Sequence, residues 1–267
     1  MDRTITAAIC AAFLAGAPAV AADLPNPLAD SPTWDMLRED IAGTAPLAPP
    51  DGRFAIDAPY RAEDAATVPI RIRAAGGPPI ETATLVIDEN PAPVAGEFTF
   101  GPAMAPLDFE LRVRVNQYSN VRVIAGYADG LRMGGRFVKA SGGCSAPATK
   151  APGQALAGLG NMKLRLFDAP PASTPQRREA QVMIRHPNYS GLQLDQVTQL
   201  FIPAHFIDHV EVWQGEERLF AMDGGISISE NPAFRFRYTD NGAPALKVIA
   251  TDTDGNRFEQ VLPKAGT

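Results

Sequence analysis

The stretch VRVIAGYADGLRMGGRFVKA, residues 121–140, decides the fold because it has the pattern of two strands joined by a tight turn. Apolar and charged residues alternate in Val121–Val123, and Tyr127–Gly130 ends in Asp-Gly, a pair favoured in two-residue hairpin turns. A second strand should then run toward Lys139. Just upstream, Phe109–Val115 alternates in the same way. These residues therefore predict antiparallel β-sheet.

The same pattern recurs 125 residues later in LKVIATDTDGNRFEQVLPKA, residues 246–265. Eight of the twenty aligned positions are identical, including both Asp-Gly turns. Lys264 closes the second hairpin as Lys139 closes the first. We therefore expect a structural repeat, with one β-rich half before residue 145 and another after it.

Short strand candidates fill both halves of the chain, and long helices are not expected. The strand candidates lie at Val68–Arg73, Thr82–Ile87, Val182–Arg185, Val210–Trp213, Arg218–Met222, Phe234–Tyr238 and Leu246–Ala250. Strands at this spacing are typical of β-sandwiches. Ahead of them, Ser31 and Pro32 favour the start of a short helix whose Trp34, Leu37 and Ile41 share one face. The predicted fold is all-β with a short N-terminal helix.

The N-terminus and the overall charge restrict where the protein works and what it binds. Residues 1–22 are predicted to be a cleaved signal peptide, because Ile5–Leu14 is apolar but too short to span a bilayer, and Ala19–Ala21 suits a signal peptidase. The formal net charge is −6 and no basic run occurs. We therefore expect a soluble periplasmic protein that binds neither nucleic acid nor an anionic membrane.

Residues 145–175 are predicted to be a flexible linker between two domains, because Ser145–Gly160 is rich in small residues, Pro and Gly. The first domain would then span residues 23–144 and the second residues 176–267. The first domain would end at a cysteine for which the second has no counterpart.

Cys144 is the main candidate for a functional residue. Removal of the signal peptide removes Cys10, which leaves one cysteine in a compartment where thiols normally oxidise. Gly142-Gly143 precede it and Ser145 follows it, so an exposed and mobile side chain is expected. Lys139 is one of two cations nearby in the sequence, and activation of the thiol should be modest. This favours a cysteine that other enzymes modify covalently. The alternatives are an intermolecular disulfide and an incidental exposed thiol.

Stretches in both halves of the sequence resemble a known protein family. VKASGGC, residues 138–144, resembles the carrier arm of SoxY, whose cysteine holds sulfur intermediates in the periplasmic Sox sulfur-oxidation system. The second half resembles its partner SoxZ at Arg185–Pro187, Ile202–Ile207, Ser229–Pro232 and the Asp254-Gly255 turn. A SoxY-like half followed by a SoxZ-like half is similar to the fused SoxYZ-like carriers associated with quinoprotein (PQQ) dehydrogenases.

The resemblance implies a specific architecture and role. It implies two immunoglobulin-like β-sandwich domains in tandem that pair within the chain, with Cys144 as the carrier cysteine and Ser141, Gly142, Gly143 and Ser145 as the arm. The implied function is a non-enzymatic periplasmic carrier of a sulfur-containing intermediate. Its partners would be sulfur-oxidation-type enzymes or a quinoprotein dehydrogenase. No cofactor, catalytic residue or metal site is expected. Because the arm lies inside the chain, it must present the cysteine as a loop.

Other functions remain as alternatives. One is a non-covalent accessory or binding module for a periplasmic PQQ-dependent dehydrogenase, and another is a thiol-dependent enzyme. His205 and His209 are four residues apart and could bind a metal with Asp208 if they lay on a helix. However, Val210 and Val212 alternate as in a strand, so a helix is not expected there. His186 is expected to make packing or turn contacts.

Overall fold

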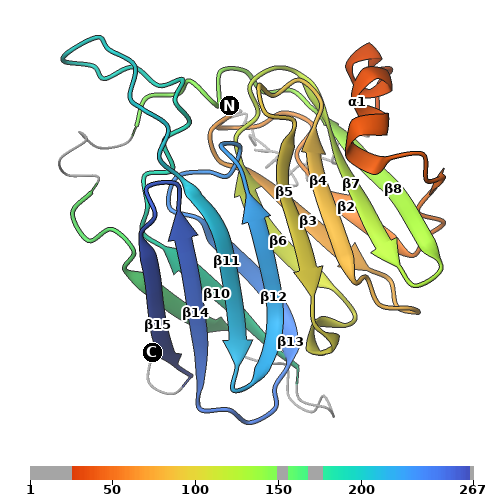
Figure 1. The fold of residues 1–267 in the computed structure, drawn as a ribbon. Coiled ribbons are helices and arrows are strands. Elements are labelled where there is room, and N and C mark those ends of the chain that lie inside the picture. The colour runs from red at the N-terminus through yellow and green to blue at the C-terminus, as the bar shows by residue number, and fades with distance from the viewer. Residues whose placement is uncertain (1–25, 149–155, 168–176, 265–267) are drawn as a thin grey trace, which may run out of the picture.

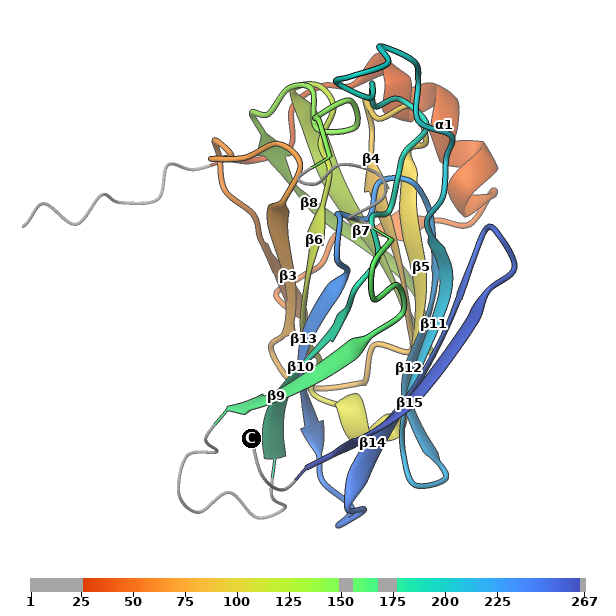
Figure 2. The same ribbon diagram turned by 90° about the vertical axis from the view of Figure 1, so that its left-hand side faces the viewer.

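The computed structural model describes residues 26–148, 156–167 and 177–264, and its strands form two sheets. Figure 2 shows the two sheets packed face to face, with β3, β13 and β10 in one layer and β5, β11 and β12 in the other. The predicted signal peptide lies outside the described residues. In the described part of the chain, no helix has the length and apolar character needed to cross a membrane.

Helix α1 (Pro32–Ala42) begins where the sequence predicts it. The Ser31 side chain accepts a hydrogen bond of 3.1 Å from the Trp34 backbone N–H, and Pro32 needs no such partner at the first helical position. Trp34 is buried against Val86 and Ile124, which anchors the helix on the outer face of one sheet (Figure 1). The short N-terminal helix is therefore confirmed.

The larger sheet has nine strands that come from both halves of the chain. In spatial order they are β1 (Leu47–Ala48), β8 (Gly130–Val138), β7 (Ser119–Tyr127), β4 (Thr82–Ile87), β5 (Val94–Phe100), β12 (Glu217–Gly224), β11 (Ile207–Gln214), β14 (Ala245–Asp252) and β15 (Arg257–Pro263).

The smaller sheet has six strands, again from both halves. They are β2 (Phe54–Asp57), β3 (Val68–Ala74), β6 (Asp108–Val113), β13 (Ala233–Thr239), β10 (Arg177–Ile184) and β9 (Met162–Phe167). A single 3-10 turn, Pro102–Met104, precedes β6 in this part of the chain.

The order of the strands repeats about the middle of each sheet. In the larger sheet, the order β8-β7-β4-β5 is followed by β12-β11-β14-β15, so the hairpins β7–β8 and β14–β15 hold equivalent places on either side. These are the two hairpins that are similar in sequence. The all-β prediction of two immunoglobulin-like sandwiches is confirmed, and the two sandwiches join edge to edge through β5–β12 and β6–β13.

Both sandwiches share one hydrophobic core. Phe109 of the first half lies with its ring centroid 5.4 Å from that of Phe98 and 5.1 Å from that of Phe220 in the second half. Phe234 and Phe236 extend the cluster and are buried. The predicted pairing of the halves thus takes the form of continuous sheets over a common core.

The predicted linker is wrong for residues Met162–Phe167, which form strand β9. This strand pairs antiparallel with β10 over six residues, from Glu179 opposite Phe167 to Ile184 opposite Met162. Met162 and Leu164 point into the core and are buried. The Pro- and Gly-rich residues before β9 hid its alternating pattern. The division into residues 23–144 and 176–267 stays a prediction.

Candidate functional site

The cysteine arm begins where the sequence places it, at the end of strand β8. The Lys139 N–H donates to the Tyr60 carbonyl at 2.8 Å, and the Lys139 carbonyl accepts from the Ala62 N–H at 3.1 Å. Five residues later, Cys144 lies off the end of the sheet. The chain therefore passes directly from a paired strand into the arm.

The prediction that Cys144 is exposed is wrong, because the structure buries it completely. The arm is held by main-chain hydrogen bonds from Gly142 to the Asn116 carbonyl at 2.8 Å and from Gly143 to the Val115 carbonyl at 3.1 Å. A Cβ atom on Gly143 would lie 2.1 Å from the Ala65 carbonyl oxygen, closer than any real contact. Gly143 therefore permits close packing of the backbone, a second use of glycine that the sequence analysis overlooked.

The second half of the chain also holds the arm. The Ser190 hydroxyl donates to the Cys144 carbonyl, and the Gln193 side-chain amide donates to the Ala146 carbonyl at 2.8 Å. Ser141 and Ser145, on either side of the buried pair Gly143 and Cys144, are exposed. The cysteine thus lies between the two halves, and the backbone of the arm is hydrogen-bonded to both, in what we call the docked state.

The electrostatics of the docked state suppress the nucleophilicity of the thiol. Burial raises the pKa of Cys144 to about 11, and the nearby Arg114 guanidinium lowers it by a smaller amount. Because the thiolate is the nucleophile, a docked Cys144 is protected from reaction near neutral pH. A reactive Cys144 requires the arm to leave this position.

Arg114 is the charged residue at this site that the sequence analysis missed. It is 1% exposed and donates from Nη2 to the Asn188 carbonyl at 2.9 Å and from Nε to the Ile228 carbonyl at 3.4 Å. Burial lowers its pKa, and attraction to a Cys144 thiolate partly opposes that effect. In the alternating stretch 109–115 it shares the polar face with Arg112. This pattern predicts that the Arg114 side chain is exposed to solvent. In the structure, the second half of the chain covers it.

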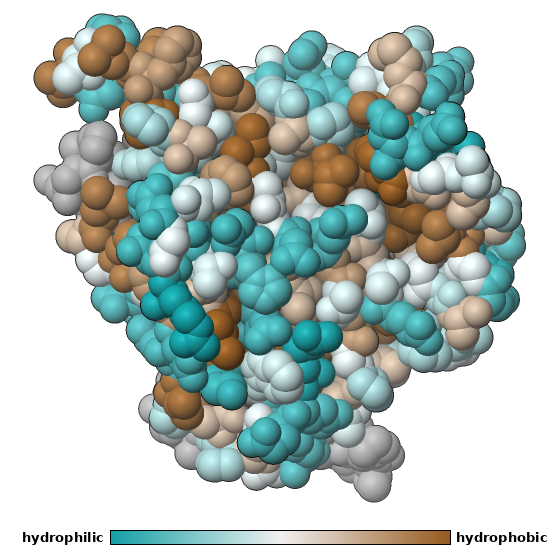
Figure 3. Space-filling view, viewed as in Figure 1, coloured by the Kyte–Doolittle hydropathy of each residue, from teal (hydrophilic) through white to brown (hydrophobic). Residues whose placement is uncertain are grey.

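The loop that holds the arm ends in an exposed apolar tip. It carries Leu194, Val197, Leu200 and Phe201, of which Val197 is 90% exposed. Figure 3 shows hydrophobic residues at the upper left of the molecule, where Figure 1 shows this loop projecting. Exposed apolar surface of this kind is typical of sites that contact other proteins.

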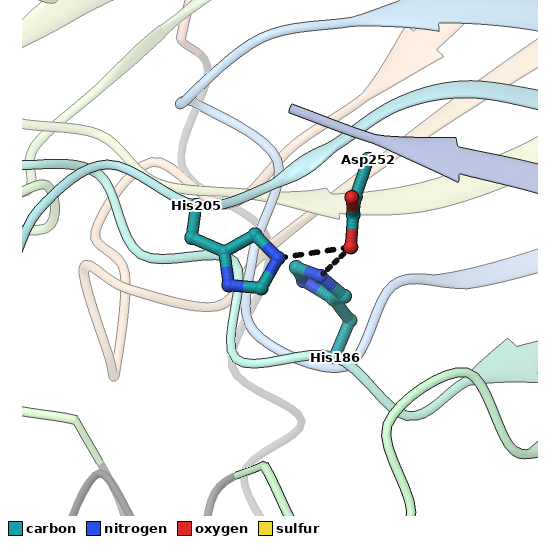
Figure 4. A group of neighbouring side chains, drawn as sticks. All are labelled: His186, His205 and Asp252. Atoms are coloured by element: carbon teal, nitrogen blue, oxygen red, sulfur yellow. Dashed lines mark hydrogen bonds and ion pairs between the residues drawn. The ribbon is translucent and has the colours of Figure 1, made fainter. Parts of the chain in front are cut away.

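A second cluster of polar side chains lies where three strand ends meet. His186 follows β10, His205 precedes β11 and Asp252 ends β14, and both imidazole Nε2 atoms approach the Asp252 Oδ2 atom, at 3.3 Å and 2.9 Å (Figure 4). Burial would raise the pKa of Asp252, but hydrogen bonds from Asn256 and His205 lower it to about 2. The carboxylate is therefore ionised at neutral pH.

The histidine pair considered from the sequence does not come together. His209 lies within strand β11 and its Nδ1 is 2.7 Å from Asp223, whereas His205 faces Asp252. The Asp208 carboxylate accepts from the Thr251 hydroxyl at 2.6 Å. The expectation that this segment is a strand and not a helix is confirmed. The histidine that shares Asp252 with His205 is His186, which sequence spacing does not connect to it.

Comparison with known families divides the chain into two parts. The family described as sulfur oxidation protein SoxY matches residues 38–144, and the family described as sulphur oxidation protein SoxZ matches residues 169–263. Among solved structures, the sulfur carrier protein SoxY from Chlorobium limicola f thiosulfatophilum is similar, with 25% identity and a TM-score of 0.34. That similarity covers 40% of this chain and 89% of the solved one. No curated protein matches the chain.

Proposed function

Because the chain belongs to the fused SoxYZ-like sulfur-oxidation carriers, we propose that Cys144 holds a sulfur-containing intermediate through a covalent bond to its Sγ atom. The observation that carries the proposal is the position of Cys144 on a glycine-containing arm beyond β8, between the two halves. Ser141, Gly142, Gly143 and Ser145 form the arm. In this proposal they deliver the cysteine, and the protein itself catalyses no reaction.

The docked arm must open for the cysteine to be loaded or unloaded. Opening breaks the hydrogen bonds that Gly142 and Gly143 donate to the first half, together with those from Ser190 and Gln193 of the second. Each such bond contributes roughly 0.5–1.5 kcal/mol net. The summed free energy of these hydrogen bonds keeps the docked arm dominant and still allows a partner protein to release it. The docked state would then protect the thiol, or a small adduct, from unwanted chemistry.

Two features beside the arm support delivery of an anionic cargo to a partner. Arg114 is a buried cation next to Cys144, and it would offset the negative charge of a thiolate or an oxidised sulfur group. The exposed apolar tip at Leu194–Phe201 lies on the loop that latches the arm. A partner that contacts this tip would meet the arm at the same time.

The partners and the compartment follow from the same proposal. We assign the protein to the periplasm, reached through the signal peptide in residues 1–22. Its partners there would be sulfur-oxidation-type enzymes or a quinoprotein dehydrogenase. Because the arm continues into the second half of the chain, it would enter a partner as a loop and requires a cleft open at both sides.

Burial of the thiol favours one alternative function. A non-covalent accessory module for a periplasmic PQQ-dependent dehydrogenase would have no need for a reactive cysteine. The 0% exposure of Cys144 and its raised pKa agree with that role. The two functions differ in whether the Sγ atom is required.

Replacement of the sulfur atom distinguishes the carrier from the accessory module. In cells that oxidise sulfur compounds through this protein, Cys144→Ser should abolish the activity, whereas the matched arm variant Ser141→Ala should retain it. The amount of each variant in the periplasm is measured in parallel. Full activity of Cys144→Ser at normal protein levels would reject the carrier and favour the accessory module.

A further inference from the structure

Three side chains from separate strand ends converge on one point in the second half of the chain. A ring nitrogen of His186, a ring nitrogen of His205 and a carboxylate oxygen of Asp252 all lie within 4.8 Å of one another. His186 and Asp252 are buried, and His205 is half-buried (Figure 4). The two imidazole rings meet edge to face, with centroids 4.6 Å apart and planes inclined by 82°. Both rings therefore direct a nitrogen toward the same carboxylate oxygen.

The two nitrogen–oxygen distances are close to those in the ligand shell of a small transition-metal ion. Ligand atoms about 2.0–2.1 Å from Zn²⁺ lie roughly 3.3–3.4 Å apart when they occupy tetrahedral corners. The two nitrogen–oxygen distances here are 3.3 Å and 2.9 Å. The three ligand atoms lie within 4.8 Å of one another, so a bound metal ion would draw the two imidazole nitrogens together by up to about 1.5 Å. Two imidazoles and one carboxylate also suit zinc and its neighbours better than Ca²⁺ or Mg²⁺, which prefer oxygen ligands.

The surrounding residues orient the carboxylate. The Asp252 Oδ1 atom accepts hydrogen bonds from the backbone N–H groups of Asp254 at 3.0 Å and Asn256 at 2.9 Å. These bonds direct Oδ2 toward the histidines. Outer contacts of this kind orient the ligands of metal sites in proteins.

The imidazole of His186 is oriented as well. Its Nδ1 atom lies 2.8 Å from the Asn188 Oδ1 atom and 3.0 Å from the Asn188 N atom. The Asn188 Oδ1 atom in turn accepts from the Ile207 N–H at 3.1 Å. These contacts fix the plane of the ring and leave Nε2 directed at Asp252.

The site has an open side and a connection to the cysteine arm. The Asp254 Oδ2 atom lies 3.4 Å from the His205 Nε2 atom, and its side chain is 59% exposed, so either this carboxylate or a water could serve as the fourth ligand. On the buried side, the Asn188 carbonyl accepts a hydrogen bond from Arg114, the cation beside Cys144. A metal here would fix the start of the loop in which Ser190 and Gln193 donate hydrogen bonds to the arm.

From this geometry we propose that His186, His205 and Asp252 bind a divalent transition-metal ion of the zinc class. The bound ion joins the ends of β10 and β14 to the start of β11. It is separate from the carrier cysteine, and the proposal stands whether or not Cys144 carries cargo. The competing explanation is a hydrogen-bonded cluster of two imidazoles and a carboxylate that binds no metal.

The test is a calorimetric titration of the metal-free full chain with Zn²⁺, in a Cys144→Ser background so that the thiol contributes nothing. One Zn²⁺ per chain is expected. His205→Gln should weaken the affinity by at least about 100-fold, the upper end of what losing even an outer contact costs. The matched control is His209→Gln, which removes the remaining histidine of the sequence and should leave the affinity unchanged.

A second measurement identifies the ligand atoms directly, so that the test does not depend on the folding of one variant. Zinc X-ray absorption of the Cys144→Ser protein should show two imidazole nitrogens at about 2.0–2.1 Å and no sulfur at about 2.3 Å. Asp252→Asn should also lose the site while circular dichroism verifies its fold. The proposal is overturned if Cys144→Ser binds no stoichiometric Zn²⁺, if the absorption data show fewer than two imidazoles, or if His205→Gln binds as tightly as His209→Gln.

Discussion

Replacing Gly143 with alanine should release the cysteine arm from its docked position. The added Cβ would lie 2.1 Å from the Ala65 carbonyl oxygen and 2.7 Å from that of Val115. Both atoms belong to the backbone, so the arm has to lift by about 1 Å to restore contact distances. Lifting breaks the Gly143–Val115 hydrogen bond and weakens the neighbouring one from Gly142.

The size of the effect follows from these two bonds. At 0.5–1.5 kcal/mol each, their loss destabilises docking by about 1–3 kcal/mol and raises the open population by about 5- to 150-fold. The contrast between the states is large, because burial raises the pKa of Cys144 to about 11 when docked. With its unshifted pKa of 9.0, the thiol is about 3% ionised at pH 7.5, whereas the docked thiol is ionised to about 0.03%.

The assay is the rate of alkylation of Cys144 by iodoacetamide at pH 7.5, followed by intact mass. Gly143→Ala should react about 5- to 150-fold faster than the wild type, and Ser141→Ala within about twofold of it. The same chain in concentrated urea supplies the rate of a fully exposed thiol. Circular dichroism establishes that both variants keep their sheets.

Two results would refute the docked state. If the wild type reacts as fast as the urea-unfolded chain, Cys144 is not protected in solution. If Gly143→Ala reacts at the wild-type rate, the close approach to Ala65 does not hold the arm.

Three further predictions concern pH and the shared core. Because docking raises the pKa of Cys144 from 9.0 to about 11, the protonated thiol contributes fully to the stability of docking below pH 9, and this contribution is lost as the pH rises through 11. The logarithm of the wild-type alkylation rate should therefore keep rising past pH 9, and a plateau there would contradict the buried thiol. Phe109→Ala should cost about 3–5 kcal/mol and lower a single unfolding transition seen by calorimetry, because its ring contacts both halves. Separate transitions for the two halves would show that the core is not shared. Leu164→Ala should cost about 2–3 kcal/mol in urea unfolding because β9 packs this side chain into the core; no loss of stability would mean that this segment is a linker after all.

Local sequence patterns predicted the fold well where side-chain alternation and turn chemistry coincide. The strand Thr82–Ile87 has the bounds that were expected, and the Ser31 cap begins α1. The similar hairpins at 121–140 and 246–265 revealed the internal repeat before the strand order did. These features depend on neighbouring residues, which a single sequence displays directly.

The errors arose where contacts distant in the sequence decide the structure. Glycines beside Cys144 suggested a free arm, because backbone freedom is visible in a sequence and close packing against Ala65 is not. Arg114 alternates like a surface residue and is buried because the other half of the chain covers it. The sequence predicts a linker at strand β9 because residues rich in Pro and Gly precede its short alternating pattern.

The candidate functional residues divide in the same way. The prediction of Cys144 rests on its rarity and its place after a strand, which are properties of the sequence. The sequence does not predict the pairing of His186 with His205, because they lie 19 positions apart with a loop between them and Asp252 ends a third strand. A folded structure was needed to bring the three together.

The proposal that Cys144 carries a covalently bound cargo is tested most directly by the intact mass and peptide map of the protein purified from its native cells, before and after a mild reductant. We expect a mass increment that maps to Cys144 and disappears on reduction, and that increment identifies the cargo. An unmodified monomeric thiol under every growth condition would contradict it, as would a doubled mass that collapses on reduction, which indicates an intermolecular disulfide.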